Sequence, residues 1–288
     1  MEIHGFTVQN WKYIIGKMPK EDAFNIRKNP IILAVADGVT RDPMTYLPGT
    51  SDLIGKIIFA VDYPRPSPAS EISEKFCAEF PLTMSSFLNQ TTSAINTSFN
   101  FINNKIIKKY NQQAFPKPDF ITKDLAGCVA AGVAVLQNHI NWGYICDSGV
   151  ALFDSHGNLI EKTKSEDPHR LDKIIWEDHI IKGKSWREPE VRARIRSYYR
   201  NNPSNPNSYG VLTGQEQAMH YVRTGTYEFK PGQLVIAYTD GVSDIIFENG
   251  DIQGTVADMI KARRFKKLRK HCKRNVKHEG TLAYCLNN

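Results

Sequence analysis

The chain has 288 residues, of which 41% are hydrophobic, and its 37 Lys and Arg against 30 Asp and Glu give a net charge of +7. This length permits a substantial core, in one large domain or two small ones. No N-terminal segment reads as a secretory signal, and every apolar run is far shorter than the roughly 18 residues of a membrane span. We therefore expect a soluble, cytoplasmic protein with no membrane partner.

Two further features of the composition limit the possible functions. The cysteines are odd in number and scattered, without a C-x-x-C pair, so we expect free, mostly buried thiols and neither structural zinc nor a redox centre; they are Cys77, Cys128, Cys146, Cys272 and Cys285. Much of the positive charge lies in "KARRFKKLRKHCKR", Lys261 to Arg274. The rest of the chain is close to balanced, so charge alone gives a weak indication of nucleic acid as a partner.

The first third of the chain predicts strands followed by helices. The segments "IHGFTVQN" and "DAFNI" read as short strands, and an apolar strand ending at Asp37 follows. A proline-rich connector, "YPRPSPAS", precedes a helix in "SEISEKFCAEF" that has a serine as candidate N-cap. A second helix is predicted in "SAINTSFNFINNKIIKKY", because Ile95, Phe99, Ile102 and Ile106 share one face.

The rest of the chain alternates between strands and polar segments. From Leu125, apolar segments separated by turn residues predict an antiparallel meander. The polar region around 162–208 is either a mobile flap or a surface excursion, and its stretch "EPEVRARIRSYYR" predicts an amphipathic helix. After the strand in "GQLVIAYTDG", a long basic helix leads to "TLAYCL", which we expect to be the closing strand.

Two apolar strands end in the same dipeptide, as "IILAVADGVT" and "GQLVIAYTDGVSDII" show. A carboxylate at the end of a buried strand is held rigidly and suits a hard divalent cation, and the glycine after it permits a tight turn or a close approach. A single Asp-Gly is more often only a turn. Other acids accompany these two in order along the chain: Glu21, Asp22, Asp147 and Asp244.

This ordered set of acids resembles the metal-dependent protein phosphatases of the type 2C (PPM) family over nearly the whole chain. The resemblance implies an α+β fold, an αββα sandwich of two antiparallel sheets flanked by helices. It further implies a single PPM-type domain over 1–288, with the region 162–208 as a flap-like excursion. A cleft at one end of the sandwich would hold two Mn²⁺ or Mg²⁺ ions, and a third ion if a weaker site is filled.

The resemblance also assigns roles to particular residues. Asp37 would bridge two metals, Glu21 and the Gly38 carbonyl would hold one, and Asp240 would hold the other, so that Asp37 and Asp240 carry the catalysis. Asp147 and Asp244 match the acids of the third site, and Asp22 matches the acid beside the first ligand. Metal ions about 4 Å apart activate a water that attacks phosphorus, so no enzyme nucleophile is needed.

The chain departs from the family pattern in several places. The family's last acidic motif is replaced by "HEGT", in which His278 takes the ligand position unless a one-residue shift presents Glu279 instead; a third reading is that this ligand is lost. Lys17 stands where the family often has a phosphate-binding arginine, and either holds phosphate less specifically or faces solvent without a role. Cys146 replaces a glycine, and we expect it to be a small buried filler.

The resemblance makes the expected function the hydrolysis of phosphoserine or phosphothreonine in a phosphorylated protein substrate. An alternative is a pseudophosphatase, a module that keeps the fold and binds phosphoproteins without turnover. A third hypothesis, binding of nucleic acid through Lys261 to Arg274, ranks last, because no groove-reading motif or stacking pattern accompanies the charge. A solvated helix face is the preferred interpretation of that segment, because Phe265, Leu268 and Cys272 would form an inward apolar stripe beneath the charges.

Overall fold

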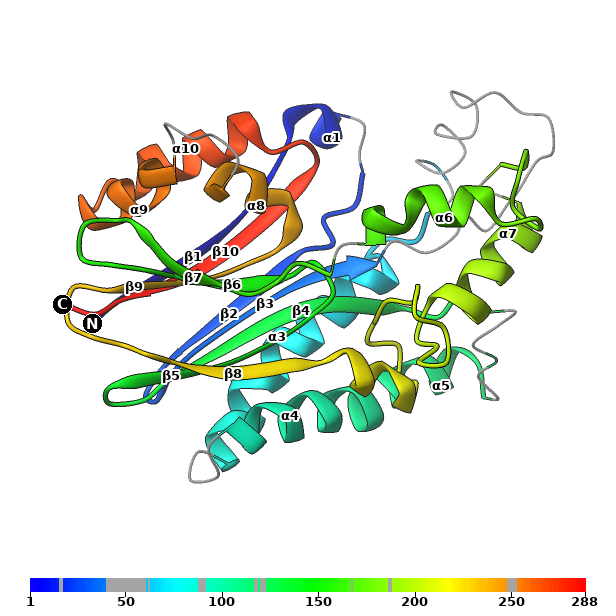
Figure 1. Cartoon of the computed structure of the whole chain (residues 1–288), viewed down its shortest axis with the longest axis horizontal. Coiled ribbons are helices and arrows are strands. Elements are labelled where there is room, and N and C mark those ends of the chain that lie inside the picture. Colours follow the sequence, from blue (N-terminus) through cyan, green and yellow to red (C-terminus); the bar gives the residue numbers. More distant parts are fainter. Residues whose placement is uncertain are drawn as a thin grey trace.

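The structure is a computed structural model that describes residues 1–15, 18–39, 61, 63–87, 92–116, 119, 123–166, 168–185, 188–247 and 253–288. Lys17, the candidate phosphate-binding residue, lies outside these ranges. Two five-stranded antiparallel sheets pack face to face, with helices on both outer faces (Figure 1). The predicted αββα sandwich is therefore confirmed.

The two sheets contain strands from distant parts of the chain. Sheet A has the order β1 (Glu2–Gln9), β10 (Glu279–Leu286), β9 (Leu234–Tyr238), β6 (Gly149–Phe153) and β7 (Leu159–Lys162). Sheet B has the order β2 (Ala23–Lys28), β3 (Ile31–Val39), β4 (Gly127–Val135), β5 (His139–Ile145) and β8 (Arg223–Glu228). The predicted first strands and the predicted closing strand are all present.

Helices cover each sheet. On sheet B lie α3 (Pro68–Phe87) and α4 (Thr92–Phe101), after which the chain passes through a π-helical segment (Ile102–Ile107) into α5 (Lys108–Ala114). On sheet A lie α8 (Asp240–Phe247), α9 (Gln253–Lys261) and α10 (Phe265–Asn275), and the short α1 (Trp11–Ile15) follows β1 (Figure 1). Within the described ranges, none of the helices combines the length and apolar character of a transmembrane span.

The alternation of side chains along β3 gives this strand two buried faces. Ile32 and Ala34 pack with the helices over sheet B, whereas Leu33 and Val35 pack between the two sheets. Successive strand residues point to opposite faces, so Asp37 shares the face of Leu33 and Val35 and is directed toward sheet A. The buried strand thereby delivers its carboxylate to the open end of the space between the sheets.

The first Asp-Gly lies within a strand, whereas the sequence predicted that this strand would end at Asp37. Strand β3 continues through Gly38 to Val39, which pairs with Gly127 of β4. Gly38 is required there for packing, since an added Cβ would lie 2.7 Å from the backbone oxygen of Ala69. The second Asp-Gly behaves differently, because β9 ends at Tyr238 and Asp240 opens helix α8.

The predicted meander is interrupted at Cys146. Strands β4 and β5 form a hairpin in sheet B, and β6 and β7 form one in sheet A, so the chain crosses between the sheets after β5. Cys146 makes this crossing with a positive φ of 68°. Glycine adopts this backbone region without the cost of about 1–2 kcal/mol that other residues incur. The side chain is buried, as predicted, and all five cysteines are buried free thiols.

The polar excursion is packed onto the body of the protein. It contains a 3₁₀ turn (Pro168–Leu171), α6 (Asp172–Glu177), α7 (Pro189–Arg194) and a π-helical segment (Ile195–Tyr199). The last two confirm the helix predicted in "EPEVRARIRSYYR". Its apolar side chains join the cluster that covers sheet B; they are Leu171, Ile175, Ile181, Val191 and Tyr199. The region is therefore an anchored helical excursion.

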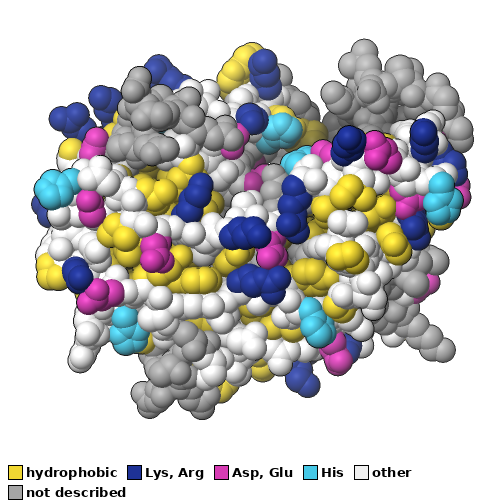
Figure 2. Space-filling view, viewed as in Figure 1, with side chains coloured by type: hydrophobic (Ala, Val, Ile, Leu, Met, Phe, Trp, Pro, Cys, Tyr) yellow, Lys and Arg dark blue, Asp and Glu magenta, His cyan; other side chains and the backbone are white. Residues whose placement is uncertain are grey.

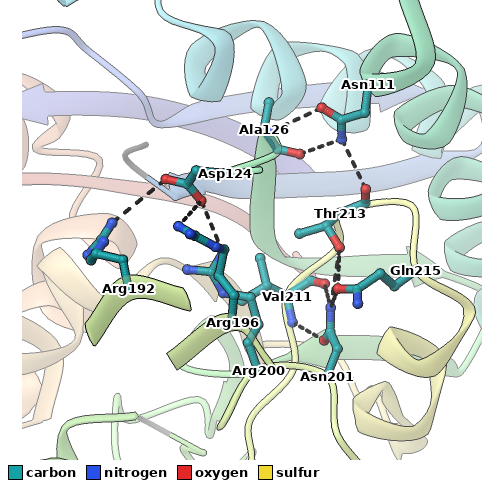
Figure 3. Close-up of polar contacts among 10 residues, drawn as sticks. All are labelled: Asn111, Asp124, Ala126, Arg192, Arg196, Arg200, Asn201, Val211, Thr213 and Gln215. Carbon is teal, nitrogen blue, oxygen red and sulfur yellow. Dashed lines mark hydrogen bonds and ion pairs between the residues drawn. The ribbon is translucent and has the colours of Figure 1, made fainter. Parts of the chain in front are cut away.

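An ion cluster fastens this excursion to the start of β4 (Figure 3). The Asp124 carboxylate lies 3.7 Å from Arg192, 3.9 Å from Arg196 and 3.5 Å from Arg200, and all four side chains are at most 16% exposed. Burial lowers the pKa of Arg192 to about 9, helped by the neighbouring charges of Arg200 and Arg196. One acid thus balances part of the charge of three arginines.

Amide side chains hold the adjoining segment "YGVLTG" in place (Figure 3). Asn201 accepts a hydrogen bond from the Val211 amide and donates to the Val211 carbonyl, both at 2.8 Å. Asn111 donates to the carbonyls of Ala126 and Thr213, at 2.8 and 3.0 Å. These contacts satisfy buried backbone groups of the segment and so give it a structural role.

Candidate metal centre

A pocket of about 640 Å³ opens at the end of the sandwich where β3 ends and α8 begins. Acidic side chains from both sheets line it; they are Glu21, Asp22, Asp37, Asp240, Asp244 and Glu279. Gly38 and His278 lie in the same wall. Asp147 is not among the lining residues, but its charge is close enough to raise the pKa of Asp37. The structure thus brings most of the candidate residues to one place.

Asp22 and Asp37 form the centre of the acidic group. Their carboxyl groups are hydrogen-bonded to each other, and the Thr239 hydroxyl donates to Asp22 at 2.8 Å. Burial raises the pKa of Asp22 to about 6, against the effect of its hydrogen bonds. Burial also raises the pKa of Asp37 well above its usual range, and the charges of Asp22 and Asp240 add to the shift. Such mutual repulsion is what a divalent cation relieves.

Glu279 links the acidic group to the opposite sheet. Its two carboxylate oxygens accept hydrogen bonds from the backbone amides of Glu21 and Asp22, each at 3.0 Å. Burial, and then the charge of Asp22, raise the pKa of Glu279 to about 8. In "HEGT", Glu279 therefore lies against the acidic pair, which favours the shifted register over a ligand role for His278.

His278 has a different partner at the rim of the pocket. Its Nδ1 is hydrogen-bonded to the Tyr13 hydroxyl at 2.5 Å, and the two ring centroids lie 4.7 Å apart. Partial burial lowers the pKa of His278, and the nearby Asp240 opposes this shift. His278 thus contacts Tyr13 and lies near Asp240, and both neighbours line the pocket.

Glu21 is held by hydroxyl groups at the start of α3. Its Oε1 accepts hydrogen bonds from Tyr63 at 3.0 Å and from Ser67 at 2.6 Å. Ser67 also accepts a hydrogen bond from the Ser70 amide and is the N-cap of α3, in place of the serine predicted within "SEISEKFCAEF". The orientation of Glu21 is consequently coupled to the N-terminus of this helix.

The two acids of α8 lie one helical turn apart. Asp240 is exposed at the first position, whereas Asp244 forms an ion pair with Lys277 at 2.6 Å. A cation at Asp244 therefore competes with an ammonium group already in contact. This weakens the case for Asp244 as a ligand and leaves Asp240 accessible from the pocket.

The donor set fits a divalent cation in its chemistry, although its present geometry does not. Among the described residues, no three His, Cys, Asp or Glu side chains are arranged so that they could hold a metal ion. Carboxylate oxygens are nevertheless the ligands that Mg²⁺ and Mn²⁺ prefer, and Asp22, Asp37 and Asp240 converge on one pocket. Both carboxylate oxygens of Glu279 and one of Glu21 already accept hydrogen bonds from the protein, so a cation at either residue would share or displace these donors.

Several residues that shape the site were missed from the sequence. Thr239 and Thr281 both bond Asp22. Thr239 directly follows β9, two positions after the inward-facing Ala237, and Thr281 lies on β10, two positions before the inward-facing Ala283. Strand alternation alone could have placed these two threonines between the sheets. Tyr13, Tyr63 and Ser67 gave no such signal, because their contacts depend on segments distant in the sequence.

The acidic pair predicts that the metal-free protein loses stability as pH rises. A carboxyl whose pKa is higher in the folded state keeps its proton after the unfolded chain has released one, so unfolding becomes easier between the two pKa values. For Asp22, with a pKa raised to about 6, the loss between pH 4 and pH 8 is about 2.4 kcal/mol. Urea unfolding in EDTA at several pH values would measure it.

Asp22→Asn provides the matched comparison for this measurement. The variant removes one of the paired acids and also relieves Asp37, so its stability should depend less on pH over the same range. Equal pH dependence in the two proteins would contradict the assignment of the raised pKa to this pair.

Known proteins share this fold, although their similarity is found by comparing structures and not by comparing sequences. The sequence matches no model of a known protein family, and sequence comparison with characterised proteins finds no match. Comparison with solved structures, however, finds the fold of the PPM-type serine/threonine phosphatases over the full chain, in agreement with the resemblance in the sequence.

Three solved structures illustrate this similarity. The Mycobacterium tuberculosis serine/threonine phosphatase PstP/Ppp has a TM-score of 0.59 at 14% identity, over 100% of this chain and 99% of that one. The catalytic domain of PstP in complex with two manganese ions has a TM-score of 0.57 at 14% identity, over 98% and 96% of the two chains. Stp1 from Staphylococcus aureus has a TM-score of 0.57 at 14% identity, over 100% and 95%.

Proposed function

We propose that this protein is a metal-dependent phosphatase that hydrolyses phosphoserine or phosphothreonine in proteins. The observation that carries the proposal is the convergence of Asp22, Asp37 and Asp240 on one pocket, in a fold shared over the full chain with serine/threonine phosphatases. One of those phosphatases was solved with two manganese ions, which supports Mn²⁺ or Mg²⁺ as the cofactor here.

Each acidic residue has a distinct task in this proposal. Asp37 would contact both ions from β3, Asp240 would hold one from α8, and the Gly38 carbonyl with Glu21 would complete the other. When bound, the ions supply an activated water and neutralise charge on the phosphoryl group. Asp22 keeps Asp37 in position through their shared hydrogen bond, and Thr239 fixes Asp22 in turn.

The test is hydrolysis of p-nitrophenyl phosphate and of a phosphothreonine peptide by the purified chain with Mn²⁺, with Mg²⁺ or with EDTA. We expect turnover with at least one of the two metals and none in EDTA, and release of phosphate from the peptide. Turnover that persists in EDTA would contradict metal dependence. Hydrolysis of p-nitrophenyl phosphate without any peptide hydrolysis would contradict the proposed protein substrate and indicate a phosphatase that acts on another class of phosphate ester.

A second candidate, the pseudophosphatase, is favoured by one observation. Glu21, Glu279 and Asp244 are each occupied by protein donors, so metal binding requires several contacts to break. In that case a folded chain would bind a phosphothreonine peptide without hydrolysing it in any metal. Calorimetric titration with Mn²⁺ separates the two candidates, because the pseudophosphatase would show weak binding or none.

A further inference from the structure

The helix α10 carries a continuous basic face on the outside of sheet A. Lys266, Arg269, Lys270, Lys273 and Arg274 follow the spacing that places side chains on one side of a helix, and Lys267 lies beside them. The opposite side is anchored by buried Leu268 and Cys272. We call these six cations the α10 stripe. Several separate Lys and Arg side chains lie along the upper left edge of Figure 2, where α9 and α10 lie in Figure 1.

The α10 stripe is not neutralised within the described part of the chain. All six side chains are exposed, and none of them forms an ion pair there. Neighbouring cations do have partners, since Arg263 pairs with Glu2 at 2.9 Å and Lys277 with Asp244 at 2.6 Å. The stretch 261–274 holds nine basic residues and no acidic one, while the other 274 residues hold 28 basic and 30 acidic ones. The net positive charge of the protein therefore comes from this segment.

The α10 stripe leads toward the acidic pocket. Near its start, Phe265 packs against His4 of β1 with ring centroids 5.2 Å apart, and the helix ends at Asn275. Two residues later the chain enters the pocket wall with Lys277 and His278, where Asn10 bonds the His278 carbonyl at 2.7 Å. An 11-residue helix is about 16 Å long, so the stripe extends outward from the pocket by that distance.

This position has an electrostatic consequence for a phosphorylated substrate. Six acidic residues of the described ranges line the pocket, which repels an anion unless cations are bound. Clustered positive charge beside such a pocket attracts anionic partners and raises their rate of encounter. The stripe has a single sign of charge and no exposed aromatic residue, so it offers no stacking surface for the bases of a nucleic acid.

We propose that the α10 stripe is a docking surface for an acidic segment of the phosphorylated substrate protein. This inference rests on the proposed phosphatase function and names the substrate class of that site. An extended chain advances about 3.3 Å per residue, so about five residues of a segment lying along the stripe span its length, on one side of the phosphorylated residue in the pocket. The preferred substrate is thus a phosphoserine or phosphothreonine with a run of Asp or Glu on one side.

The test measures binding separately from turnover. Two fluorescein-labelled, unphosphorylated peptides of equal length carry a threonine followed by six Glu or by six Gln, and anisotropy is recorded in EDTA at 50 and 200 mM salt. The variant Lys266→Gln/Lys270→Gln/Lys273→Gln is compared with Lys28→Gln/Lys105→Gln/Lys109→Gln, which removes the same charge from exposed lysines on the sheet B side. A nucleic acid duplex of similar charge serves as a competitor.

We expect the wild type to bind the Glu peptide more tightly than the Gln peptide. The α10 variant should bind the Glu peptide about tenfold more weakly than the wild type does, and the control variant should bind it with little change. Equal losses in both variants would show a net-charge effect and overturn the proposal. Tighter binding of the duplex than of the peptide, with the same dependence on α10, would assign the surface to nucleic acid and overturn it as well. A chain without phosphatase activity would leave this binding result intact, so the two failures are distinguishable.

For an active enzyme, the phosphothreonine forms of the two peptides give a second readout. The ratio of kcat/KM for the Glu peptide to that for the Gln peptide should fall about tenfold in the α10 variant. An unchanged ratio would place peptide docking away from the catalytic pocket and contradict the geometry proposed for the substrate.

Discussion

Replacing Asp37 by Asn is expected to lower metal-dependent hydrolysis of p-nitrophenyl phosphate by at least about a thousandfold, the scale at which lost charge stabilisation acts in active sites. The carboxylate projects from β3 toward sheet A and lies next to both Asp22 and Asp240. An amide of the same size keeps the packing but supplies one neutral oxygen where the two proposed cations would need a shared anionic ligand. The fold should therefore remain while the cation site is lost.

Initial rates with saturating Mn²⁺ measure this loss, and thermal unfolding with and without Mn²⁺ shows whether the cation still binds. Asp258→Asn is the matched control, because Asp258 is an exposed acid on α9, outside the pocket. The Asp37→Asn substitution should abolish the Mn²⁺-dependent rise in Tm, and the control should retain it. Comparable rates in wild type and Asp37→Asn would contradict the central role of this carboxylate.

Replacing Asp124 by Asn is expected to lower the free energy of unfolding by about 3–5 kcal/mol, the usual cost of removing one partner from a buried ion pair. Three guanidinium groups face this one carboxylate in a nearly buried cluster (Figure 3). Without it, they repel one another with little solvent to screen them. Urea unfolding of the two proteins measures the difference.

A double substitution tests whether repulsion among the arginines is the cause. Adding Arg192→Gln to Asp124→Asn removes one of the cations and should restore about 1 kcal/mol, while Arg192→Gln alone should destabilise the wild type. If Asp124→Asn cost less than about 1 kcal/mol, the value of an exposed pair, the cluster would not be what fastens the helical excursion to the start of β4.

Strand alternation explains why much of the architecture could be predicted from the sequence. In β3, residues 32 and 34 pack under the helices, and residues 33 and 35 pack between the sheets. Because both faces are buried, the strand appears in the sequence as one uninterrupted apolar run. The helical spacing of Ile95, Phe99, Ile102 and Ile106 likewise predicted a buried helix face; the first three are fully buried, and Ile106 is half-buried against the same cluster. Where burial in the core determines which face of an element points inward, the local periodicity of the sequence is sufficient to predict that face.

The candidate site was predictable as a set of acids but not as a set of contacts. The resemblance named Asp37 and Asp240, and the pocket contains both. The orientation of Glu279 depends on backbone amides more than 250 positions earlier, and that of Glu21 on hydroxyls about 40 positions later. Contacts at such separations follow from tertiary packing, which no local pattern encodes.

The same limit explains the departure at Cys146. The turn residues on either side of β5 predicted hairpins, but nothing local distinguishes a hairpin from a crossing between two sheets. The positive φ of Cys146 at this crossing became visible only in the folded chain. A glycine at this position would have indicated a positive φ from the sequence, whereas a cysteine gives no such indication.

Some members of the acidic group belong to sheet A and others to sheet B, and this arrangement has a consequence for how the two sheets hold together. Asp37 belongs to sheet B, Glu279 belongs to sheet A, and Asp22, at the start of β2, is tied to Thr239 at the end of β9. A cation held among them would act as a clamp between the layers at their open end. Separating the sheets would then require its release, so occupancy of the site should slow unfolding as well as enable chemistry.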